Sequence, residues 1–248
     1  MSSDGIQQLA KGQCDRGDIG VCSVIVEPNG ERTFYKHHGV ERNGFLDQNS
    51  ISSLVECDGD FILASGYTFE LTKQRESALS AWRNLSKQAI TIFDPSPVHN
   101  RLEQQYLNEI LACSSWVSLS ENEALEITRR TSTAEASISL ADHGPNVVVR
   151  SGARGAFVAL ANSKKAECIP TISVVAVDTT AAGETHIGVM AHALSRGATV
   201  PSAVRLANIA AALSTTRHGA STGPHLEALY AAISAVPGVD QTLGKLLR

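Results

Sequence analysis

The sequence lacks the features that mark exported, metal-clustered and membrane-spanning proteins. Its five cysteines are widely spaced, odd in number and form no CxxC pair, which fits neither a zinc site nor a disulfide framework. No stretch approaches eighteen consecutive apolar residues, and the N-terminus has no basic patch followed by an apolar run. We therefore expect a cytoplasmic protein with reduced thiols, no export signal and no membrane partner.

The sequence also lacks a concentration of charge of one sign. The 21 basic and 25 acidic residues nearly balance and are scattered, so no stripe of Lys or Arg predicts a nucleic-acid surface. The eight histidines show no HxH or HExxH spacing, so we interpret His186 and His192 as packing or surface residues rather than metal ligands. A small molecule is the expected partner, and nucleic acid is not.

The chain does have enough apolar sequence for one α/β domain, since 43% of its 248 residues are hydrophobic. Two β-prone runs, 21–26 and 32–35, flank an Asn29-Gly30 turn, which predicts a β-hairpin. Apolar runs then alternate with helical stretches, which predicts βαβ units on a parallel sheet. The expected strands are 61–64, 89–93, 116–119, 146–149, 155–160 and 171–177, and the expected helices are 71–86, 102–112, 121–129, 134–141, 184–196, 202–215 and 224–235.

The most informative segment runs from Val174 to His186, where an apolar run ends, small residues follow and a helix begins. Small side chains let backbone N–H groups approach an anion, and the positive end of the helix dipole favours phosphate. A carboxylate at Glu184 would accept a proton from a substrate hydroxyl while the amides stabilise charge developing on the phosphate. From these residues alone an alternative stays open, in which Glu184 only complements the helix dipole and the small residues only pack.

This segment resembles the D-T-x-G/A-A-G-D-T-F signature of the ribokinase (PfkB) family of carbohydrate kinases. Further segments resemble motifs of that family in the same order: Asn29 to Thr33 (D-G-E-R), Phe93 to Pro97 (N/D-P-x-P), Ser120 to Ala124 (N-E-x-E-A), Val148 to Ala156 (V-x-T/K-x-G-x-x-G) and Thr216 to Ala220 (T-R-x-G-A). The resemblance implies one ribokinase-like domain over 1–248, a parallel-sheet core with flanking helices. It places a hairpin from the lid region at about 18–38 and the nucleotide-binding core at about 55–248.

The resemblance implies ATP-dependent phosphorylation of a sugar or sugar-like hydroxyl, with ATP and Mg²⁺ as cofactors and K⁺ as a further ion. Ala181, Ala182 and Gly183 would form the anion hole, and Glu184 would stand at the catalytic base. The family has Asp there, and the extra methylene of Glu can displace the carboxylate by about 1 Å, which matters where positioning governs the rate. A weakened base is our favoured interpretation, and a lost catalyst is the alternative.

The same resemblance implies residues that border the nucleotide and its metal ions. The nucleotide set is Ser120, Glu123, Arg150, Gly152, Arg154, Gly155 and Asn208, and the monovalent-cation set is Asp178, Thr180, Ser214, Arg217 and Gly219. Glu123 resembles a carboxylate that organises water around Mg²⁺, whereas Ser120 is shorter than the family's Asn. From the residues alone, a plain hairpin turn is the preferred interpretation of 150–155, and a mid-helix Asn208 could equally form only local hydrogen bonds.

The chain departs from the family most at its front. The sugar-binding Asp on a first strand and the following G-G-x-x-x-N segment have no counterpart, so the sheet is expected to be incomplete, with an unpaired edge and an exposed apolar face. A start site placed too late, a truncated gene product and a shortened protein with another task remain open as explanations. The second hypothesis is therefore a catalytically impaired, truncated nucleotide-binding homologue. A dinucleotide-dependent oxidoreductase ranks behind because G-x-G-x-x-G is missing. Family resemblance and the hairpin agree with a homodimer.

Overall fold

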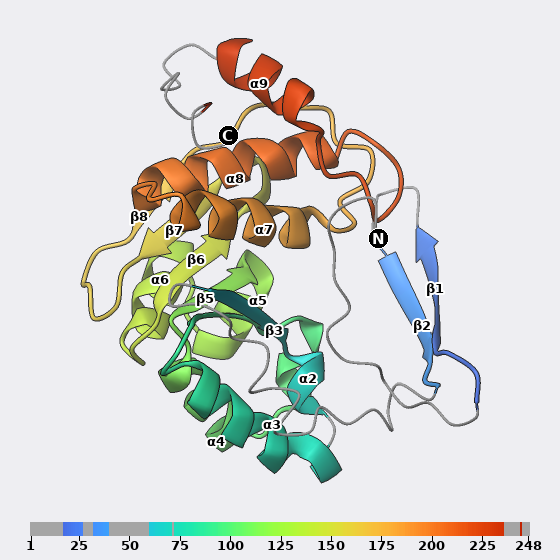
Figure 1. Cartoon of the computed structure of the whole chain (residues 1–248), viewed down its shortest axis with the longest axis vertical. Helices are drawn as coiled ribbons and strands as arrows, with labels where there is room; N and C mark the ends of the chain where they lie inside the picture. The colour runs from blue at the N-terminus through green and yellow to red at the C-terminus, as the bar shows by residue number, and fades with distance from the viewer. Residues whose placement is uncertain (1–16, 27–31, 40–59, 71, 236–243, 245–248) are drawn as a thin grey trace.

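The computed structural model describes residues 17–26, 32–39, 60–70, 72–235 and 244. A six-stranded sheet in the order β3-β4-β5-β6-β7-β8 forms its centre (Figure 1). The strands are β3 (Phe61–Ser65), β4 (Ile90–Asp94), β5 (Trp116–Ser120), β6 (Asn146–Arg150), β7 (Ala156–Ala159) and β8 (Glu167–Ile169). β3 to β6 are parallel, whereas β7 and β8 each run antiparallel to the preceding strand. The predicted parallel core is confirmed, and the last two strands make the sheet mixed.

Helices cover both faces of this sheet, which explains why its central strands are apolar at successive positions. Val147 and Val149 of β6 pack into the core beneath one helical layer, whereas Val148 packs into the core beneath the other. The first layer contains α2 (Tyr67–Glu70), α3 (Thr72–Leu85), α4 (Gln104–Cys113), α5 (Glu121–Thr128) and α6 (Thr133–Ala141). The second contains α7 (Ala182–Ser195), α8 (Val200–Ser214) and α9 (Leu226–Ala235). Short 3₁₀ turns, η3 (Pro97–Arg101) and η4 (Gly152–Arg154), follow β4 and β6.

The N-terminal hairpin is confirmed as a separate two-stranded sheet. β1 (Val21–Val26) and β2 (Arg32–His37) pair antiparallel from Val21 opposite His37 to Val26 opposite Arg32. The Asn29-Gly30 turn lies outside the described residues. The hairpin lies apart from the six-stranded sheet (Figure 1). The Lys36 ammonium lies 3.8 Å from the centre of the ring of Tyr67, the first residue of α2.

One predicted strand is wrong and one strand was missed, both between β7 and α7. The segment 171–177 has no strand, although its β-branched residues favour one. The amides of Val177 and Asp178 instead donate to the Thr215 carbonyl, at 2.7 and 3.1 Å, and the Val175 side chain is 85% exposed. The missed strand, β8, is only three residues long and reads as part of a turn-rich segment.

The opposite end of the sheet is an edge. β3 is the terminal strand there, and no other strand in the described part of the chain pairs with its outer side. Leu63 of β3 is 51% exposed, so apolar surface is open at this edge, as expected for an incomplete sheet.

Cys22, Cys113 and Cys168 are free thiols. None of the helices found over the described ranges combines the length and apolar character needed to cross a membrane.

Candidate active site

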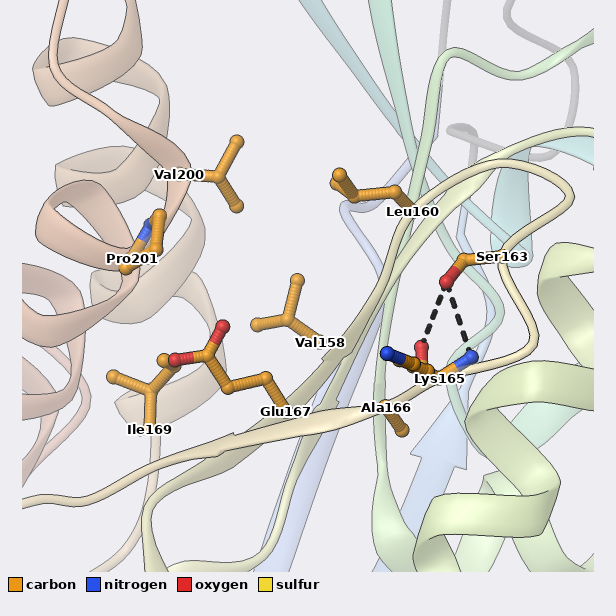
Figure 2. Close-up of a pocket in the computed structure, with 9 residues that line it drawn as sticks. All are labelled: Val158, Leu160, Ser163, Lys165, Ala166, Glu167, Ile169, Val200 and Pro201. Atoms are coloured by element: carbon orange, nitrogen blue, oxygen red, sulfur yellow. Dashed lines mark hydrogen bonds between the residues drawn. The ribbon is translucent and has the colours of Figure 1, made fainter.

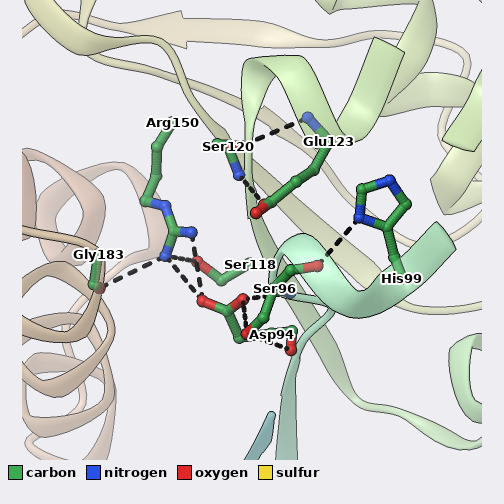
Figure 3. Close-up of polar contacts among 8 residues, drawn as sticks. All are labelled: Asp94, Ser96, His99, Ser118, Ser120, Glu123, Arg150 and Gly183. Atoms are coloured by element: carbon green, nitrogen blue, oxygen red, sulfur yellow. Dashed lines mark hydrogen bonds and ion pairs between the residues drawn. The ribbon is translucent and has the colours of Figure 1, made fainter. Parts of the chain in front are cut away.

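The candidate site lies where the carboxyl ends of three parallel strands meet the first turn of α7 (Figure 3). Ligands of open α/β sheets bind at this edge because successive strand ends and helix starts converge there. Arg150, the last residue of β6, donates from Nη1 and Nη2 to Asp94 Oδ2, at 3.3 and 3.2 Å. Its Nη1 also lies 3.3 Å from Ser118 Oγ and 3.4 Å from the Gly183 carbonyl oxygen. Arg150 therefore connects β4 and β5 with the start of α7.

The small residues 181–183 form the turn that begins α7. Ala181 is the N-cap, in a left-handed conformation with φ 59° and ψ 12°. The Ala182 amide donates to the Thr179 carbonyl at 3.3 Å, and the helical bonds begin with the Thr185 amide on the Ala181 carbonyl at 3.0 Å. The amides of Gly183 and Glu184 belong to the first turn, where a helix offers them no partner. This turn is thus shaped as a helix N-terminus with amide donors at its end.

Glu184 occupies the third helical position of that turn, and its side chain is exposed. Within the described ranges its carboxylate makes no ion pair and accepts no hydrogen bond. It is therefore a solvated carboxylate, held only by its backbone, beside the amides of the same turn. Nothing in this packing fixes its distance to a substrate, so its role as a base stays a prediction.

The left-handed Ala181 gives a stability prediction for the turn itself. We expect Ala181→Gly to raise the free energy of unfolding by about 0.5–1 kcal/mol, because a Cβ in this conformation is strained and glycine removes the strain. Ala182→Gly is the matched control: at a helical position it should lower the free energy of unfolding by about as much. Urea unfolding measures both. An equal decrease in the free energy of unfolding in the two variants would contradict the left-handed conformation of Ala181.

The predicted nucleotide loop is the hairpin turn between β6 and β7. Gly152 and Gly155 have φ of 55° and 91°, and a Cβ on Gly155 would lie 2.1 Å from the Ile169 carbonyl oxygen. Glycine is required there because β8 packs directly on the turn. Arg154 donates to the carboxylate of Glu121, the first residue of α5. That hydrogen bond, with a second from Thr133, lowers the pKa of Glu121 below its usual range.

Ser120 and Glu123 form a capping box at the start of α5. The Glu123 amide donates to Ser120 Oγ at 3.3 Å, and the Ser120 amide donates to Glu123 Oε2 at 2.8 Å. This S-x-x-E spacing is the usual signal of such a cap. The other oxygen, Oε1, accepts no hydrogen bond from the described residues, so one carboxylate oxygen is available to hold water around Mg²⁺.

Asn208 lies inside the protein rather than on a surface. It is 4% exposed, and its Nδ2 donates to the Ile169 and Pro170 carbonyls at 2.8 and 3.3 Å. Its Oδ1 must therefore accept a hydrogen bond, and the donor is His186 Nε2 at 3.1 Å. His186 Nδ1 is then unprotonated, and this buried nitrogen has no hydrogen-bond partner. The packing interpretation of His186 is confirmed, and no cluster of metal-ligating side chains occurs in the part of the chain described.

Three residues of the predicted cation site lie together at the loop before α7. Asp178 Oδ1 accepts from the Thr180 amide and hydroxyl at 2.9 and 2.6 Å, and its Oδ2 accepts from the Gly219 amide at 2.9 Å. Ser214 is buried, with its hydroxyl on the Ala211 carbonyl, whereas Arg217 is exposed. The Asp178 side chain therefore organises the loop, and carbonyl oxygens are the donors that remain for a K⁺ ion.

A separate hollow lies at the other end of α8 (Figure 2). It has a volume of about 350 Å³ and is lined mainly by apolar groups, including Val158, Leu160, Val200 and Pro201. A 15-residue helix is about 22 Å long, which separates this hollow from the Asp178 loop near the carboxyl end of α8. None of the predicted site residues lines it.

Sequence reasoning missed the polar groups that hold the site together, above all Asp94 and Ser118. The available signal was Arg150 itself, because a charged residue at the end of an apolar strand needs a counterion. Asp94 ends the parallel strand two places along the sheet, within the segment that resembles N/D-P-x-P.

The fold and this edge define an α/β protein with a six-stranded sheet between two helical layers and a small-residue helix N-terminus at the carboxyl edge of its parallel strands. The chain belongs to the pfkB family of carbohydrate kinases, whose family model matches residues 11–227. It is 27% identical over 237 residues to the uncharacterized sugar kinase YegV of Escherichia coli K12, a match that covers 94% of this chain and 71% of that protein. It is 31% identical over 137 residues to the ribokinase of Haemophilus influenzae, covering 53% of this chain and 42% of that enzyme.

Solved structures agree with the family. The chain superposes on ribokinase from Thermotoga maritima with a TM-score of 0.68 and 28% identity, covering 87% of this chain and 69% of that one. Fructokinase from Vibrio cholerae O395, solved with fructose, ADP and calcium ion, gives a TM-score of 0.71 and 28% identity, covering 85% of this chain and 72% of that one. The predicted ribokinase-like fold is confirmed, and the chain spans about 70% of the length of these two enzymes.

Proposed function

We propose that the chain transfers the γ-phosphoryl group of ATP to a hydroxyl of a sugar or sugar-like alcohol, using the first turn of α7 as the phosphate site. One observation carries the proposal: the small-residue N-terminus of α7 lies at the carboxyl edge of the parallel strands, with the Arg150 guanidinium beside Gly183. Amide donors, a helix dipole and a cation at one point favour a multiply charged anion.

Each part of the site has a task in this reaction. The turn 181–183 binds the transferring phosphate, and the Glu184 carboxylate accepts the proton of the attacking hydroxyl, where solvent exposure leaves room for a substrate. The glycine turn at 152–155 borders the nucleotide, and the buried Asn208 supports this side of the site from within by holding the Ile169 and Pro170 carbonyls. Mg²⁺, when bound, neutralises phosphate charge, and the open Oε1 of Glu123 suits a water-mediated contact to it. K⁺ is assigned to the Asp178 loop. The cell compartment proposed is the cytoplasm, and the proposed assembly is a homodimer.

A second candidate function is nucleotide binding without turnover. It is favoured by Glu184 itself, because the family's Asp is one methylene shorter and the longer side chain is not fixed by any contact within the described ranges. In this case ATP would bind at the α7 turn, but no proton would be removed from a substrate.

One experiment separates the two candidates. We expect ADP release from ATP and Mg²⁺ to depend on an added sugar, with ribose and fructose tested first because related enzymes are named for them. ATP should also raise the melting temperature of the protein. Protection by ATP without sugar-dependent ADP release would support the second candidate. Absence of both effects would overturn the proposed function.

A further inference from the structure

We propose that His99 is a positioning residue of this site. Its ring Nδ1 holds the turn at Ser96, and that turn holds the Asp94 carboxylate in the direction of Arg150. The inference rests on the proposed function, because it assigns His99 to the support of the same site. His99 lies outside every segment that resembles a family motif. It is carried by the conformation of Ser96 and by the contacts on either side of it.

The turn at Ser96 has a backbone conformation that a residue with a side chain rarely adopts. Ser96 has φ 55° and ψ 171°, close to a region that is populated almost only by glycine. Such a conformation persists only where surrounding contacts hold it, and it occurs most often at functional sites. Ser96 keeps it two residues after Asp94, the last residue of β4. The contacts that hold this turn therefore shape the carboxyl end of β4.

His99 holds the carbonyl group of Ser96. This carbonyl accepts from the His99 ring Nδ1 at 3.0 Å and from the His99 amide at 3.1 Å. A carbonyl oxygen can only accept, so Nδ1 carries the proton. His99 is 7% exposed, whereas Glu126, whose Oε2 lies 3.1 Å from Nε2, has a side chain that is 64% exposed. The bond to Ser96 is the more shielded of the two, and we expect it to be the one that the site needs.

The other side of the turn holds Asp94. The Ser96 amide and hydroxyl donate to Asp94 Oδ1, at 2.8 and 3.1 Å. Oδ2 is then the oxygen that accepts from Arg150, at 3.2 and 3.3 Å. Figure 3 shows these residues in the order His99, Ser96, Asp94, Arg150, with Gly183 of α7 beyond the guanidinium. A reoriented Ser96 would move the carboxylate and release Arg150 from its place beside the first turn of α7.

The backbone before Ser96 is already fixed by the neighbouring strand. The Gly66 amide, just after β3, donates to the Asp94 carbonyl at 2.8 Å. A Cβ on Gly66 would lie 2.1 Å from the Pro95 carbonyl oxygen, so the two segments are in close contact. The sheet thus sets the position of Asp94 and Pro95, and the next carbonyl along, that of Ser96, is oriented by His99.

The test uses two substitutions that each keep one donor of the ring. In His99→Asn the side-chain nitrogen is attached to Cγ, as Nδ1 is, so it can still donate to Ser96. In His99→Gln it lies one atom further out, as Nε2 does, so it reaches Glu126 instead. We expect His99→Asn to keep the turnover number for sugar phosphorylation within about threefold and His99→Gln to lower it about tenfold or more, since small displacements are costly where positioning governs the rate. His143→Gln, at an exposed histidine before β6, is the control and should leave the turnover number unchanged.

A second measurement does not depend on turnover. The Ser96 amide donates to Asp94, so its hydrogen exchange, followed by NMR, reports directly on the turn. Exchange should be slow in the unmodified chain and in His99→Asn, and about tenfold or more faster in His99→Gln. Glycine adopts the conformation of this turn without the penalty of a Cβ. Ser96→Gly combined with His99→Gln should therefore have the same turnover number as Ser96→Gly alone.

The outcomes are distinct from those for the proposed function. If the unmodified chain releases no ADP with any sugar, the proposed function fails and the catalytic part of this inference fails with it, while the exchange of the Ser96 amide still decides whether His99 holds the turn. If the chain is active and the Asn and Gln variants at His99 have equal turnover numbers, the inference fails and His99 only joins η3 to α5. Should His99→Gln not fold, the double variant decides. A turnover number tenfold below that of Ser96→Gly overturns the inference, and an equal one supports it.

Discussion

Replacing Glu184 with glutamine is expected to lower the turnover number for sugar phosphorylation by about 10²–10⁴-fold, the usual contribution of a positioned general base. Glutamine keeps the length and hydrogen-bonding atoms of the side chain but cannot accept the proton of the attacking hydroxyl. ATP binding should remain within a few-fold of the unmodified protein, because in the proposed site backbone amides hold the phosphate and this carboxylate does not. Coupled ADP-release assays and titration with ATP measure the two quantities separately.

Glu184→Asp is the informative companion to this variant. It restores the shorter carboxylate of the family signature, so we expect a turnover number equal to or above that of the unmodified chain. If Glu184→Gln retains full activity, Glu184 is not the base. If the Asp variant alone is active, the unmodified chain is a nucleotide-binding protein whose base is out of position, as in the second candidate function.

Acid sensitivity centred on His186 is the second large expected effect. In the folded protein burial and Arg150 lower the pKa of this imidazole to about 3, whereas an unfolded chain titrates near 6.5. Between these values the unfolded state binds more protons, so the free energy of unfolding falls as the pH drops from about 6.5 towards 3. At 1.36 kcal/mol per pKa unit, His186 accounts for a loss of roughly 5 kcal/mol over the whole window and roughly 3 kcal/mol by pH 4.5.

Urea unfolding at pH 7 and pH 4.5 measures this effect in His186→Phe and in the unmodified chain. Phenylalanine does not titrate, so the loss between the two pH values should shrink by roughly 3 kcal/mol. At pH 7 the variant is expected to be less stable by about 1–3 kcal/mol, because Asn208 Oδ1 loses its donor inside the protein. His143→Gln, at an exposed histidine, is the control and should leave the pH effect intact. An unchanged loss in His186→Phe would show that other groups cause the acid sensitivity.

Several features of the fold followed from local sequence patterns. The hairpin came from two β-prone runs around Asn29-Gly30, and the parallel core came from apolar runs alternating with helical stretches. The start of α7 came from small residues placed between an apolar run and a helical one. These patterns are informative because hydrogen bonding within a turn or a helix involves residues close in sequence.

Local pattern was insufficient where an element depends on distant partners. The segment 171–177 has strand-forming residues, but at its end the amides of Val177 and Asp178 donate to the Thr215 carbonyl, about 40 residues later, which the sequence does not indicate. β8 is a strand because β7 pairs with it, not because three residues, Glu167–Ile169, form one by themselves. The S-x-x-E spacing of Ser120 and Glu123 is a local signal of a helix cap. We assigned these two residues to the nucleotide set from the family resemblance and did not predict the cap.

By itself the sequence determined the family, the class of fold and the position of the small-residue turn that begins α7, because each depends on the order and spacing of residues within short segments. The tertiary structure decided which side chains surround that turn. Arg150 and Asp94 are 56 residues apart, and His186 and Asn208 are 22 apart, so their contacts exist only once strand order and helix packing are set. Charge balance and burial are properties of that assembled environment, and so are the stretched ion pair and the neutral histidine that result from it.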